Sequence, residues 1–387
     1  MRVSREQSGF SLERFFPTVA ATGGVFLFRI LWRGFPRRHR RLPRLKRMVG
    51  STRARVKASP GAVFRWLWLL ATVPVVALSV FRAIPAEWPV LVVQLLSFTP
   101  WLAVPAAAAL ILAFLGRSRW RQAAAVVLVV CHVFWLFPLD TARPAAAAGR
   151  PAVQLKVMNL NSEFGQADAR EIVRLVRDNG VALLAIQEHT QGLQDQLSAA
   201  GLDLLLPNRI SEPTNDAGGS AVYSRHPMEL VGVVPNTPFR MPTVRVTAES
   251  GGAVAMLEVT SVHVLPPVDV RVAQWRSDLA AVGRVAERPG NRLLIGDFNA
   301  TYDHAEFREI LTRGAGSDGE AAGLVDVGAA SGSRLVPTWP MDGQLLPGIT
   351  IDHLVTSHGL ASSGYEVHRV PGTDHAAVLA TLAIPAG

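Results

Sequence analysis

Three uncharged apolar runs near the N-terminus limit the possible folds of this chain more than any other feature. Residues 66–81, 89–115 and 122–139 contain no Asp, Glu, Lys or Arg over 16, 27 and 18 residues. A membrane-spanning helix needs about 20 apolar residues, and a flanking arginine such as Arg82 can extend a short run by snorkelling. We therefore predict about three transmembrane helices within residues 64–139. The alternative, a buried helical hairpin of a soluble protein, is disfavoured by three such runs in succession with tryptophans near their ends.

The charges of the flanking segments predict the orientation of these helices. Residues 1–63 carry 15 Lys/Arg and two Asp/Glu, and the loop at 116–121 carries three arginines, whereas the loop at 82–89 carries one Arg and one Glu. The positive-inside rule then places the N-terminus and the loop at 116–121 in the cytoplasm. With three spans, the chain beyond residue 139 lies on the outer side of the plasma membrane. A fourth span at residues 15–28, a short and glycine-rich stretch, would reverse this orientation.

The basic charge of the chain is confined to its N-terminal part. The formal net charge of +9 divides into +18 for residues 1–150 and −9 for residues 151–387. The C-terminal part therefore repels polyanions unless it holds metal ions. We interpret the basic run at 37–57 as a determinant of membrane topology, with binding to anionic lipid or to nucleic acid as the alternatives.

A linker and a lone cysteine mark the transition to the C-terminal domain. Residues 140–152 are small and contain prolines, as is typical of a linker, although their alanines also resemble a signal-peptidase site. The only cysteine, Cys131, lies in the third apolar run, so no internal disulfide can form. We predict that residues 153–387 form one domain held together by its hydrophobic core.

Strands and helices alternate along this domain. Period-two alternation and short apolar runs predict strands, and apolar residues at helical spacing predict helices. The strands are predicted at 153–161, 181–188, 218–227, 253–264, 293–297, 348–357 and 372–384, and the helices at 167–180 and 268–286.

Polar side chains recur at the ends of these apolar runs, where sheets of enzymes present their site residues. Carboxylates without cysteine are hard oxygen ligands, which suit Mg²⁺, Mn²⁺ or Ca²⁺ rather than zinc. Asp297 and Asn299 are two residues apart on an extended segment and face the same side. Each residue alone is commonly a cap or a turn residue, so the inference depends on their order and context. The candidates are Asn159, Glu188, His263, Asp297, Asn299, Asp352, Asp374 and His375.

The order of the motifs resembles the endonuclease/exonuclease/phosphatase superfamily over about residues 153–384. The motifs are "VMNLN", "LLAIQE", "GGSAVYSRHP", "SVHVLPP", "LLIGDFNAT", "TWP", "TIDHLVTS" and "GTDHAAV". The resemblance implies a four-layer α/β sandwich, in which two mainly antiparallel β-sheets pack face to face with helices on the outside. It also implies a divalent-metal phosphodiesterase or phosphatase site at one edge of the sheets.

The resemblance implies metal ligands as well. Glu188 matches the principal ligand, assisted by Asn159 and Asp374, with Mg²⁺ expected and Mn²⁺ or Ca²⁺ possible. Asn161 is the alternative to Asn159. We prefer Asn159, because in the family pattern one apolar residue directly follows the site asparagine. His353, which follows Asp352 in many bacterial members, is interpreted as a packed neighbour rather than a ligand.

The catalytic roles follow from the same resemblance. Asp297 matches the residue that orients or deprotonates water, and Asn299 the one that holds a phosphate oxygen. His375 matches the histidine that binds phosphate or activates water, and Asp352 the carboxylate that orients it. His263 occupies the position of a general acid or transition-state donor.

The sequence leaves the substrate open between a phospholipid head group and extracellular nucleic acid, as a phosphodiester or a phosphomonoester. The negative charge of the domain disfavours a nuclease that binds duplex DNA, and the tether on the outer face of the membrane favours either a lipid phosphodiester or extracellular nucleic acid. Arg225, His226 and the "TWP" at 338–340 are placed in substrate loops without assigned contacts. A non-catalytic binding module that keeps the fold is the alternative function, and it predicts the loss of a site residue. A serine hydrolase has no support, because "GGSAVYS" lacks the glycine that a nucleophile elbow places two residues after the serine.

Overall fold

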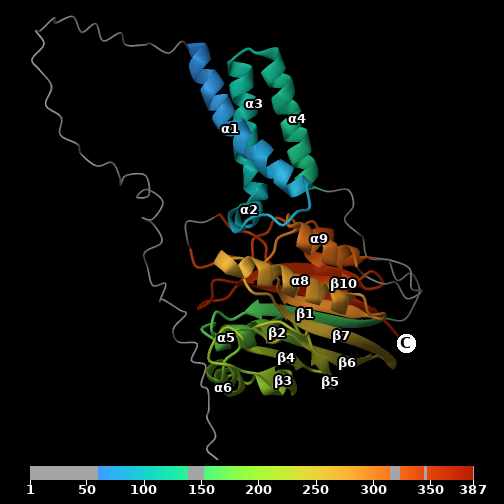
Figure 1. Ribbon diagram of the computed structural model, residues 1–387. Coiled ribbons are helices and arrows are strands. Elements are labelled where there is room, and N and C mark those ends of the chain that lie inside the picture. The colour runs from blue at the N-terminus through green and yellow to red at the C-terminus, as the bar shows by residue number, and fades with distance from the viewer. Residues whose placement is uncertain (1–59, 138–151, 314–322, 344–346, 387) are drawn as a thin grey trace, which may run out of the picture. The chain divides into compact units, whose positions relative to one another are not determined.

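The computed structural model describes residues 60–137, 152–313, 323–343 and 347–386. The predicted basic N-terminal segment, the stretch at 15–28 and nearly all of the predicted linker lie outside the described residues. The described residues form a helical bundle and a domain built on two β-sheets (Figure 1).

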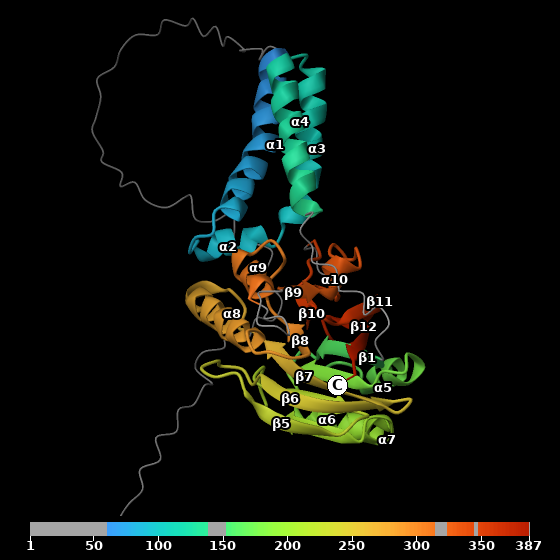
Figure 2. The same ribbon diagram turned by 90° about the vertical axis from the view of Figure 1, so that its right-hand side faces the viewer.

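The bundle consists of α1 (Pro60–Ala83), α3 (Ala103–Leu115) and α4 (Arg119–Leu136), which lie side by side (Figures 1 and 2). Small residues face one another inside it, since Ala109, Ala113 and Ala125 are fully buried, and small side chains let helices approach closely. Large apolar side chains such as Leu70, which is 74% exposed, point outward. An apolar exterior of this kind is what a helix presents to lipid.

The first and third predicted spans are single helices, and the second is broken. Within the described residues, 61–83 and 119–136 are long and apolar enough to cross a membrane. The second run forms α2 (Val90–Leu96), the 3₁₀ helix η3 (Thr99–Leu102) and α3, with a bend of 70° between 90–96 and 99–115. The bend lies just before Pro100, which lacks the amide hydrogen that an uninterrupted helix would need. Among the described helices there are therefore two candidate membrane spans, or three if the bent pair counts as one.

Arg82 does not snorkel toward a lipid surface, so this expectation is wrong. Its side chain is 5% exposed, and its Nε lies 2.6 Å from Oδ1 of Asp303 in the β-sheet domain. In surroundings with little water the attraction between two opposite charges at this distance is strong, and it offsets part of the cost of desolvating both groups.

The domain is built on two six-stranded sheets. The first has the strand order β11-β12-β1-β2-β4-β3 and the second β5-β6-β7-β8-β10-β9. Each sheet has one parallel pair at its centre, β1 with β2 and β7 with β8, and all other neighbours are antiparallel. The strands are β1 (Ala152–Asn161), β2 (Leu183–Gln187), β3 (Asn208–Glu212), β4 (Ser220–Ser224), β5 (Met228–Val233), β6 (Pro242–Ser250), β7 (Ala253–His263), β8 (Arg292–Asp297), β9 (Leu324–Asp326), β10 (Asp352–Ser357), β11 (Ala361–Arg369) and β12 (Ala376–Pro385).

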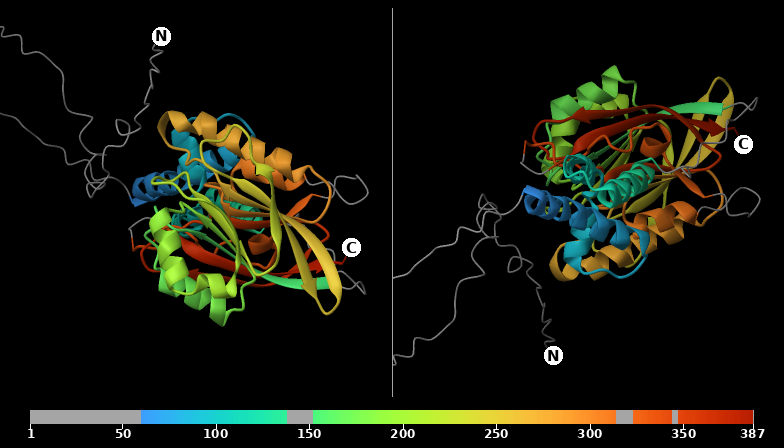
Figure 3. Two further views of the ribbon diagram at one scale, coloured as in Figure 1. Left: turned by 90° about the horizontal axis from the view of Figure 1, so that it is seen from below. Right: turned by 90° about the horizontal axis from the view of Figure 1, so that it is seen from above.

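Helices cover the outer faces of the two sheets. Seen along the sheets in Figure 3, orange α8 and green α5 lie on opposite sides. The helix α5 begins where the carboxylate of Asp168 accepts hydrogen bonds from the amides of Arg170 and Glu171, and Gly180 follows its end with a φ of 64°. The helices of the domain are α5 (Ala169–Asp178), α6 (Gln191–Ala199), α7 (Leu202–Leu205), η4 (Asp269–Arg271), α8 (Val272–Ala286), α9 (Ala305–Thr312) and α10 (Val327–Ala330).

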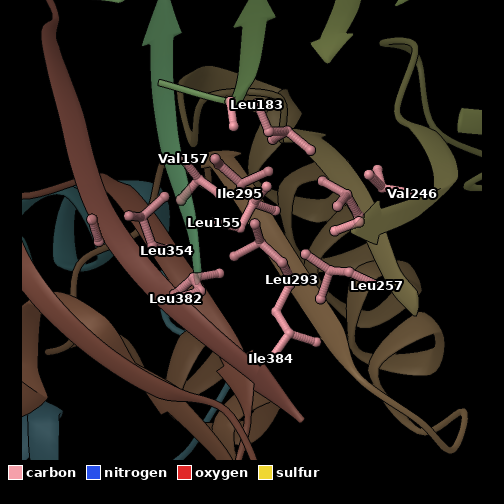
Figure 4. Close-up of a cluster of buried hydrophobic side chains, with 14 of the residues drawn as sticks. Leu155, Val157, Leu183, Val246, Leu257, Leu293, Ile295, Leu354, Leu382 and Ile384 are labelled. Carbon is pink, nitrogen blue, oxygen red and sulfur yellow. The ribbon is translucent and has the colours of Figure 1, made fainter. Parts of the chain in front are cut away.

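The main hydrophobic core lies between the sheets. Leu155 and Val157 of β1, together with Leu293 and Ile295 of β8, are fully buried there (Figure 4). Two further clusters fill the spaces beneath α5 and α6 and beneath α8 and α9. This gives the layers helix, sheet, sheet, helix, so the predicted four-layer α/β sandwich with mainly antiparallel sheets is confirmed.

Candidate active site

The two central parallel pairs bring polar side chains to one edge of the sandwich. In the first sheet Asn161, the last residue of β1, pairs with Gln187, the last residue of β2. Asn161 and Glu188, which follows Gln187, therefore lie at the same end of the sheet. In the second sheet His263 pairs with Asp297. Because the carboxyl ends of parallel strands meet at one edge, both pairs deliver their last residues to the same place.

The remaining candidates reach this edge on antiparallel strands. Asp352 is the first residue of β10 and pairs with Asp297. His375 directly precedes β12, which runs antiparallel to β1. All eight residues predicted from the sequence are thereby joined in one network, in which each has a polar atom within 4.0 Å of another member or of Asn161.

His375 is held by Asp352. Its Nδ1 lies 2.9 Å from Oδ2 of Asp352, and both side chains are buried. Its Nε2 lies 3.9 Å from Oδ2 of Asp297 and 3.8 Å from Oδ1 of Asp374. Burial opposes the charged imidazole, but the charge of Asp352 and its hydrogen bond, followed by Asp297 and Asp374, outweigh burial and raise the pKa of His375 to about 10. The ring is therefore a cation at neutral pH.

Asp297 is a buried carboxylate that accepts hydrogen bonds on both oxygens. Its Oδ1 accepts from the amide N–H of Asn299 at 2.8 Å, and its Oδ2 accepts from the side-chain amides of Asn299 and Asn161, both at 3.1 Å. Burial raises its pKa to about 7, with Asp352 adding to this and His375 opposing it. A carboxylate with such a pKa can accept a proton near neutral pH.

Asn299 is committed to holding Asp297 in place. Its φ of 46° turns the chain back after β8, and its two amide hydrogens go to Oδ2 of Asp297 and to the carbonyl oxygen of Val264. No N–H of this side chain is left for a phosphate oxygen. The geometry therefore favours a positioning role over the phosphate-binding role expected from the sequence.

Glu188 follows β2 with a φ of 55° and is linked to Asp297 through Asn161. The side-chain amide of Asn161 donates to Oε1 of Glu188 at 3.2 Å and to Asp297, while Oε2 of Glu188 accepts from the amide of Phe164 at 2.8 Å. Burial raises the pKa of Glu188. Asn159, preferred from the sequence, lies deeper on the same strand face and donates to Oδ1 of Asp352 at 3.4 Å. Asn161 is thus the asparagine closest to the Glu188 carboxylate.

His263 lies between the two sheets with its Nε2 3.7 Å from Oε1 of Glu188 and 4.0 Å from Oδ2 of Asp297. Its ring stacks on Phe239 at 4.3 Å between centroids. Burial, with the nearby charge of His375, lowers the pKa of His263 to about 3. A neutral ring donates one hydrogen bond, so the geometry favours the transition-state donor among its expected roles over a cationic general acid.

Asp374 is fixed by two contacts that the sequence did not reveal. Its Oδ2 accepts from the indole N–H of Trp339 at 2.7 Å, and its backbone amide donates to Oε2 of Glu163. Thr338, next to Trp339, accepts from the backbone amide of Asp352 through its hydroxyl. The motif "TWP" has no contacts that the sequence can predict, because only the fold brings this loop beside Asp374.

The donors at this edge fit a hard cation that keeps much of its water. Within the described parts of the chain, no three His, Cys, Asp or Glu side chains form a ready-made metal cage. The available donors are oxygens, including the carboxylates of Glu188 and Asp374, and the buried Oδ1 of Asn159 has no partner among the described residues. Mg²⁺ is commonly held by one or two carboxylates, several waters and substrate phosphates, so this set suits it better than zinc.

Two predicted substrate residues lie elsewhere. Arg225 and His226 follow β4, whose last residue, Ser224, pairs with Leu183 at the start of β2 and hence at the opposite end from Glu188. Placing them in a substrate loop of this site was wrong, because β4 is antiparallel to β2. His353 is a packed neighbour, as expected, with its Nε2 2.9 Å from the carbonyl oxygen of Ala300.

The model of the Endonuclease/Exonuclease/phosphatase family matches residues 158–375, more than half of the chain. The chain belongs to this family. No curated protein matches the sequence. Members of the family, which include nucleases and phosphatases, are hydrolases, and the endonuclease/exonuclease/phosphatase domain described above contains all the segments that the family model covers.

Solved structures resemble this domain at low sequence identity. An AP endonuclease from Archaeoglobus fulgidus is 13% identical, with 58% of this chain and 98% of that chain covered and a TM-score of 0.46. A 3′ phosphatase from Neisseria bound to a product DNA hairpin is 18% identical, with 58% and 98% covered and a TM-score of 0.45. A family protein from Bacteroides thetaiotaomicron is 13% identical, with 61% and 97% covered and a TM-score of 0.44.

Proposed function

We propose that the chain is a membrane-anchored, divalent-metal-dependent hydrolase of phosphoester bonds that acts on the outer face of the plasma membrane. The observation that carries this proposal is the network joining Glu188, Asp297 and His375, which lie far apart in the sequence. It combines a candidate metal ligand, a carboxylate with a pKa near neutrality and an imidazolium. Metal-assisted hydrolysis of a phosphoester can use all three: a metal that polarises the phosphoryl group, a base for the attacking water and a cation that offsets the developing charge.

In the proposed mechanism Asp297 orients the attacking water and accepts its proton. Asn161 and Asn299 donate hydrogen bonds to this carboxylate and fix its orientation. The carboxylate therefore loses no conformational entropy at the moment of reaction. The His375 cation, charged by Asp352, and the N–H of His263 offset the negative charge that develops on the phosphoryl oxygens.

Glu188 and Asp374, with Asn159 or Asn161, would hold the metal ion. When bound, a divalent cation polarises the phosphoryl group and stabilises its developing charge. The choice between the asparagines remains a proposal: the oxygen of Asn159 is unpartnered among the described residues, whereas Asn161 lies against Glu188.

A phospholipid head group is the proposed substrate, with extracellular nucleic acid as the alternative. The domain carries a net charge of −9 over residues 151–387, which opposes the approach of a polyanion. A lipid phosphoester reaches the site by diffusion within the bilayer to which the chain is anchored.

The test is hydrolysis by the full-length chain in detergent micelles or lipid nanodiscs. The substrates are bis-p-nitrophenyl phosphate, p-nitrophenyl phosphate, plasmid DNA, and vesicles of sphingomyelin or phosphatidylinositol, each with Mg²⁺, Mn²⁺, Ca²⁺ or chelator. We expect metal-dependent turnover that Glu188→Gln abolishes. The matched control is Glu366→Gln, which makes the same change at a carboxylate that is 42% exposed and pairs with Lys156. No turnover of any substrate by a well-folded chain would favour the non-catalytic binding module.

A further inference from the structure

The loop that follows Asp297 is fastened to the helical bundle by a buried ion-pair cluster. Asp303, which is 2% exposed, accepts at Oδ1 from the Nε of Arg82 at 2.6 Å and from Nη2 of Arg334 at 2.9 Å. Arg82 belongs to the last turn of α1, and its guanidinium lies 4.2 Å from the ring centre of Trp135 in α4. Burying three charged groups is costly, so such a cluster persists only where its geometry satisfies them together.

A buried histidine makes a second attachment in the same loop. The Nδ1 of His304 accepts from the backbone amide of Thr301 at 2.9 Å, so its Nε2 carries the hydrogen and donates to the carbonyl oxygen of Val93 in α2, also at 2.9 Å. One nitrogen of the His304 ring thus closes the loop between Asn299 and α9, and the other nitrogen attaches this loop to α2.

Arg334 extends the attachment to the segment that carries Asp352. Its Nη1 donates to the carbonyl oxygens of Trp135 and Leu136 at the end of α4, at 2.6 and 2.7 Å. Its own carbonyl oxygen accepts from the hydroxyl of Thr350, two residues before Asp352, at 3.1 Å. One carboxylate, Asp303, therefore ties together the segments leading to both Asp297 and Asp352.

A membrane anchor that serves only as a tether has no need for buried charges shared with the catalytic domain. Contacts between independently folded domains are usually polar and partly hydrated, and relative motion is the normal expectation. Here α1 and α2 bond to Asp303 and His304, in the loop that follows Asp297, and α4 bonds to Arg334, which is linked to Asp352 through Thr350. The bundle thus contributes to how those carboxylates are held.

We propose that the helical bundle is part of the active-site scaffold and that Asp303 is a positioning residue, which holds the segments of Asp297 and Asp352 through Arg82 and Arg334. This inference rests on the proposed function for its catalytic consequence, but not for its structural one. Small displacements of catalytic groups are expensive: a misplacement of about 1 Å can cost on the order of 100-fold in rate. The cluster therefore affects turnover more than substrate binding.

The test compares four variants of the full-length chain in detergent. Asp303→Asn leaves both arginines buried without their counter-charge, and we expect kcat to fall by about 10- to 100-fold with little change in KM. The kcat of Arg82→Gln should fall less than that of Asp303→Asn, because Arg334 still pairs with Asp303. Arg82→Lys keeps the charge and should recover most of the activity. Lys156→Gln breaks an ion pair 3.1 Å long between β1 and β11, outside the bundle contacts, and serves as the control with unchanged kcat.

Hydrogen exchange gives a readout that does not depend on activity. In Asp303→Asn we expect faster exchange of the backbone amides at 298–304 and 349–353, with unchanged protection of β2 at 183–187. Wild-type kcat and wild-type exchange in this variant would overturn the proposal. Loss of β2 protection in Asp303→Asn and Arg82→Gln alike would also overturn it, because the cluster would then support the whole fold rather than the site. If exchange rises locally while the wild-type chain hydrolyses no phosphoester, the scaffold role stands and the proposed function fails.

Discussion

Asp352→Asn removes the carboxylate that lies 2.9 Å from the Nδ1 of His375 and leaves a side chain of the same size. In the wild-type chain the pKa of His375 is raised to about 10, although burial acts in the opposite direction. At pH 7 only about one imidazole in 1,000 is then neutral. Without the carboxylate, burial becomes the main influence and should bring the pKa of His375 to its ordinary value of 6.5 or below. Most of the rings should then be neutral at pH 7.

The assay is an NMR titration of histidine-labelled, full-length protein in chelator, with His375→Gln used to assign the resonance. The wild-type ring of His375 should remain protonated up to about pH 9, and the Asp352→Asn ring should titrate near or below pH 6.5. A wild-type resonance that titrates near pH 6.5, or one that titrates at the same pH in both proteins, would refute the reasoning.

The same pair makes stability depend on pH in a defined direction. Because the pKa of His375 is higher in the folded chain than its ordinary value of 6.5, the pair stabilises the fold fully below about pH 6.5. This stabilisation is lost as the pH rises through about 10. The melting temperature of the metal-free wild type should therefore decline from pH 7 to pH 10 relative to that of Asp352→Asn, and parallel curves for the two proteins would contradict this.

Four further outcomes are expected. Asn161→Ala should raise the Mg²⁺ concentration for half-maximal activity by about 10- to 100-fold, measured by metal titration of hydrolysis, since partners that orient ligands have effects of that size. Trp339→Phe removes one N–H bond to the Asp374 carboxylate and should lower kcat by about tenfold or more, measured at a temperature at which the variant is folded. Gly296→Ala should destabilise the fold by about 2 kcal/mol or more in thermal unfolding, because its Cβ would lie 1.9 Å from a carbonyl oxygen of β7, whereas Gly359→Ala meets nothing within 4 Å and should be tolerated. A reporter enzyme that works only outside the cytoplasm should be active when it is fused after Gly387. An inactive reporter at normal expression would show that the C-terminal domain lies in the cytoplasm.

The sequence predicted the elements that carry the site because those strands are buried on both faces. Strands β2 and β8 are entirely buried, so their apolar runs are nearly continuous, and a carboxylate stands at the end of each: Glu188 directly after β2 and Asp297 as the last residue of β8. The edge strands β3, β5 and β11 are half-exposed, and no apolar run distinguishes them from loops, so the sequence does not predict them. The strands β6 and β9 are not predicted either, although β6 is largely buried and β9 is buried throughout.

Contacts between distant segments could not be predicted in the same way. The order of the motifs indicates which residues meet. It does not indicate that both hydrogens of the Asn299 amide are bonded within the protein, or that Asn161 lies between Glu188 and Asp297. Those facts depend on the pairing of strands far apart in the chain. The burial of Arg82 was missed for a related reason, because its partner Asp303 lies 221 residues away and an arginine at the end of an apolar run normally reaches toward the lipid surface.

The most direct test of the proposed hydrolase is the initial rate of bis-p-nitrophenyl phosphate hydrolysis by the full-length chain, measured against Mg²⁺ concentration for the wild type and for His375→Gln. The rate of the wild type should rise from zero in chelator to saturation, and the variant should lose at least about 100-fold in kcat at every Mg²⁺ concentration. A rate that does not depend on the metal, or that is the same in both proteins, would show that the network joining Glu188, Asp297 and His375 does not carry the chemistry.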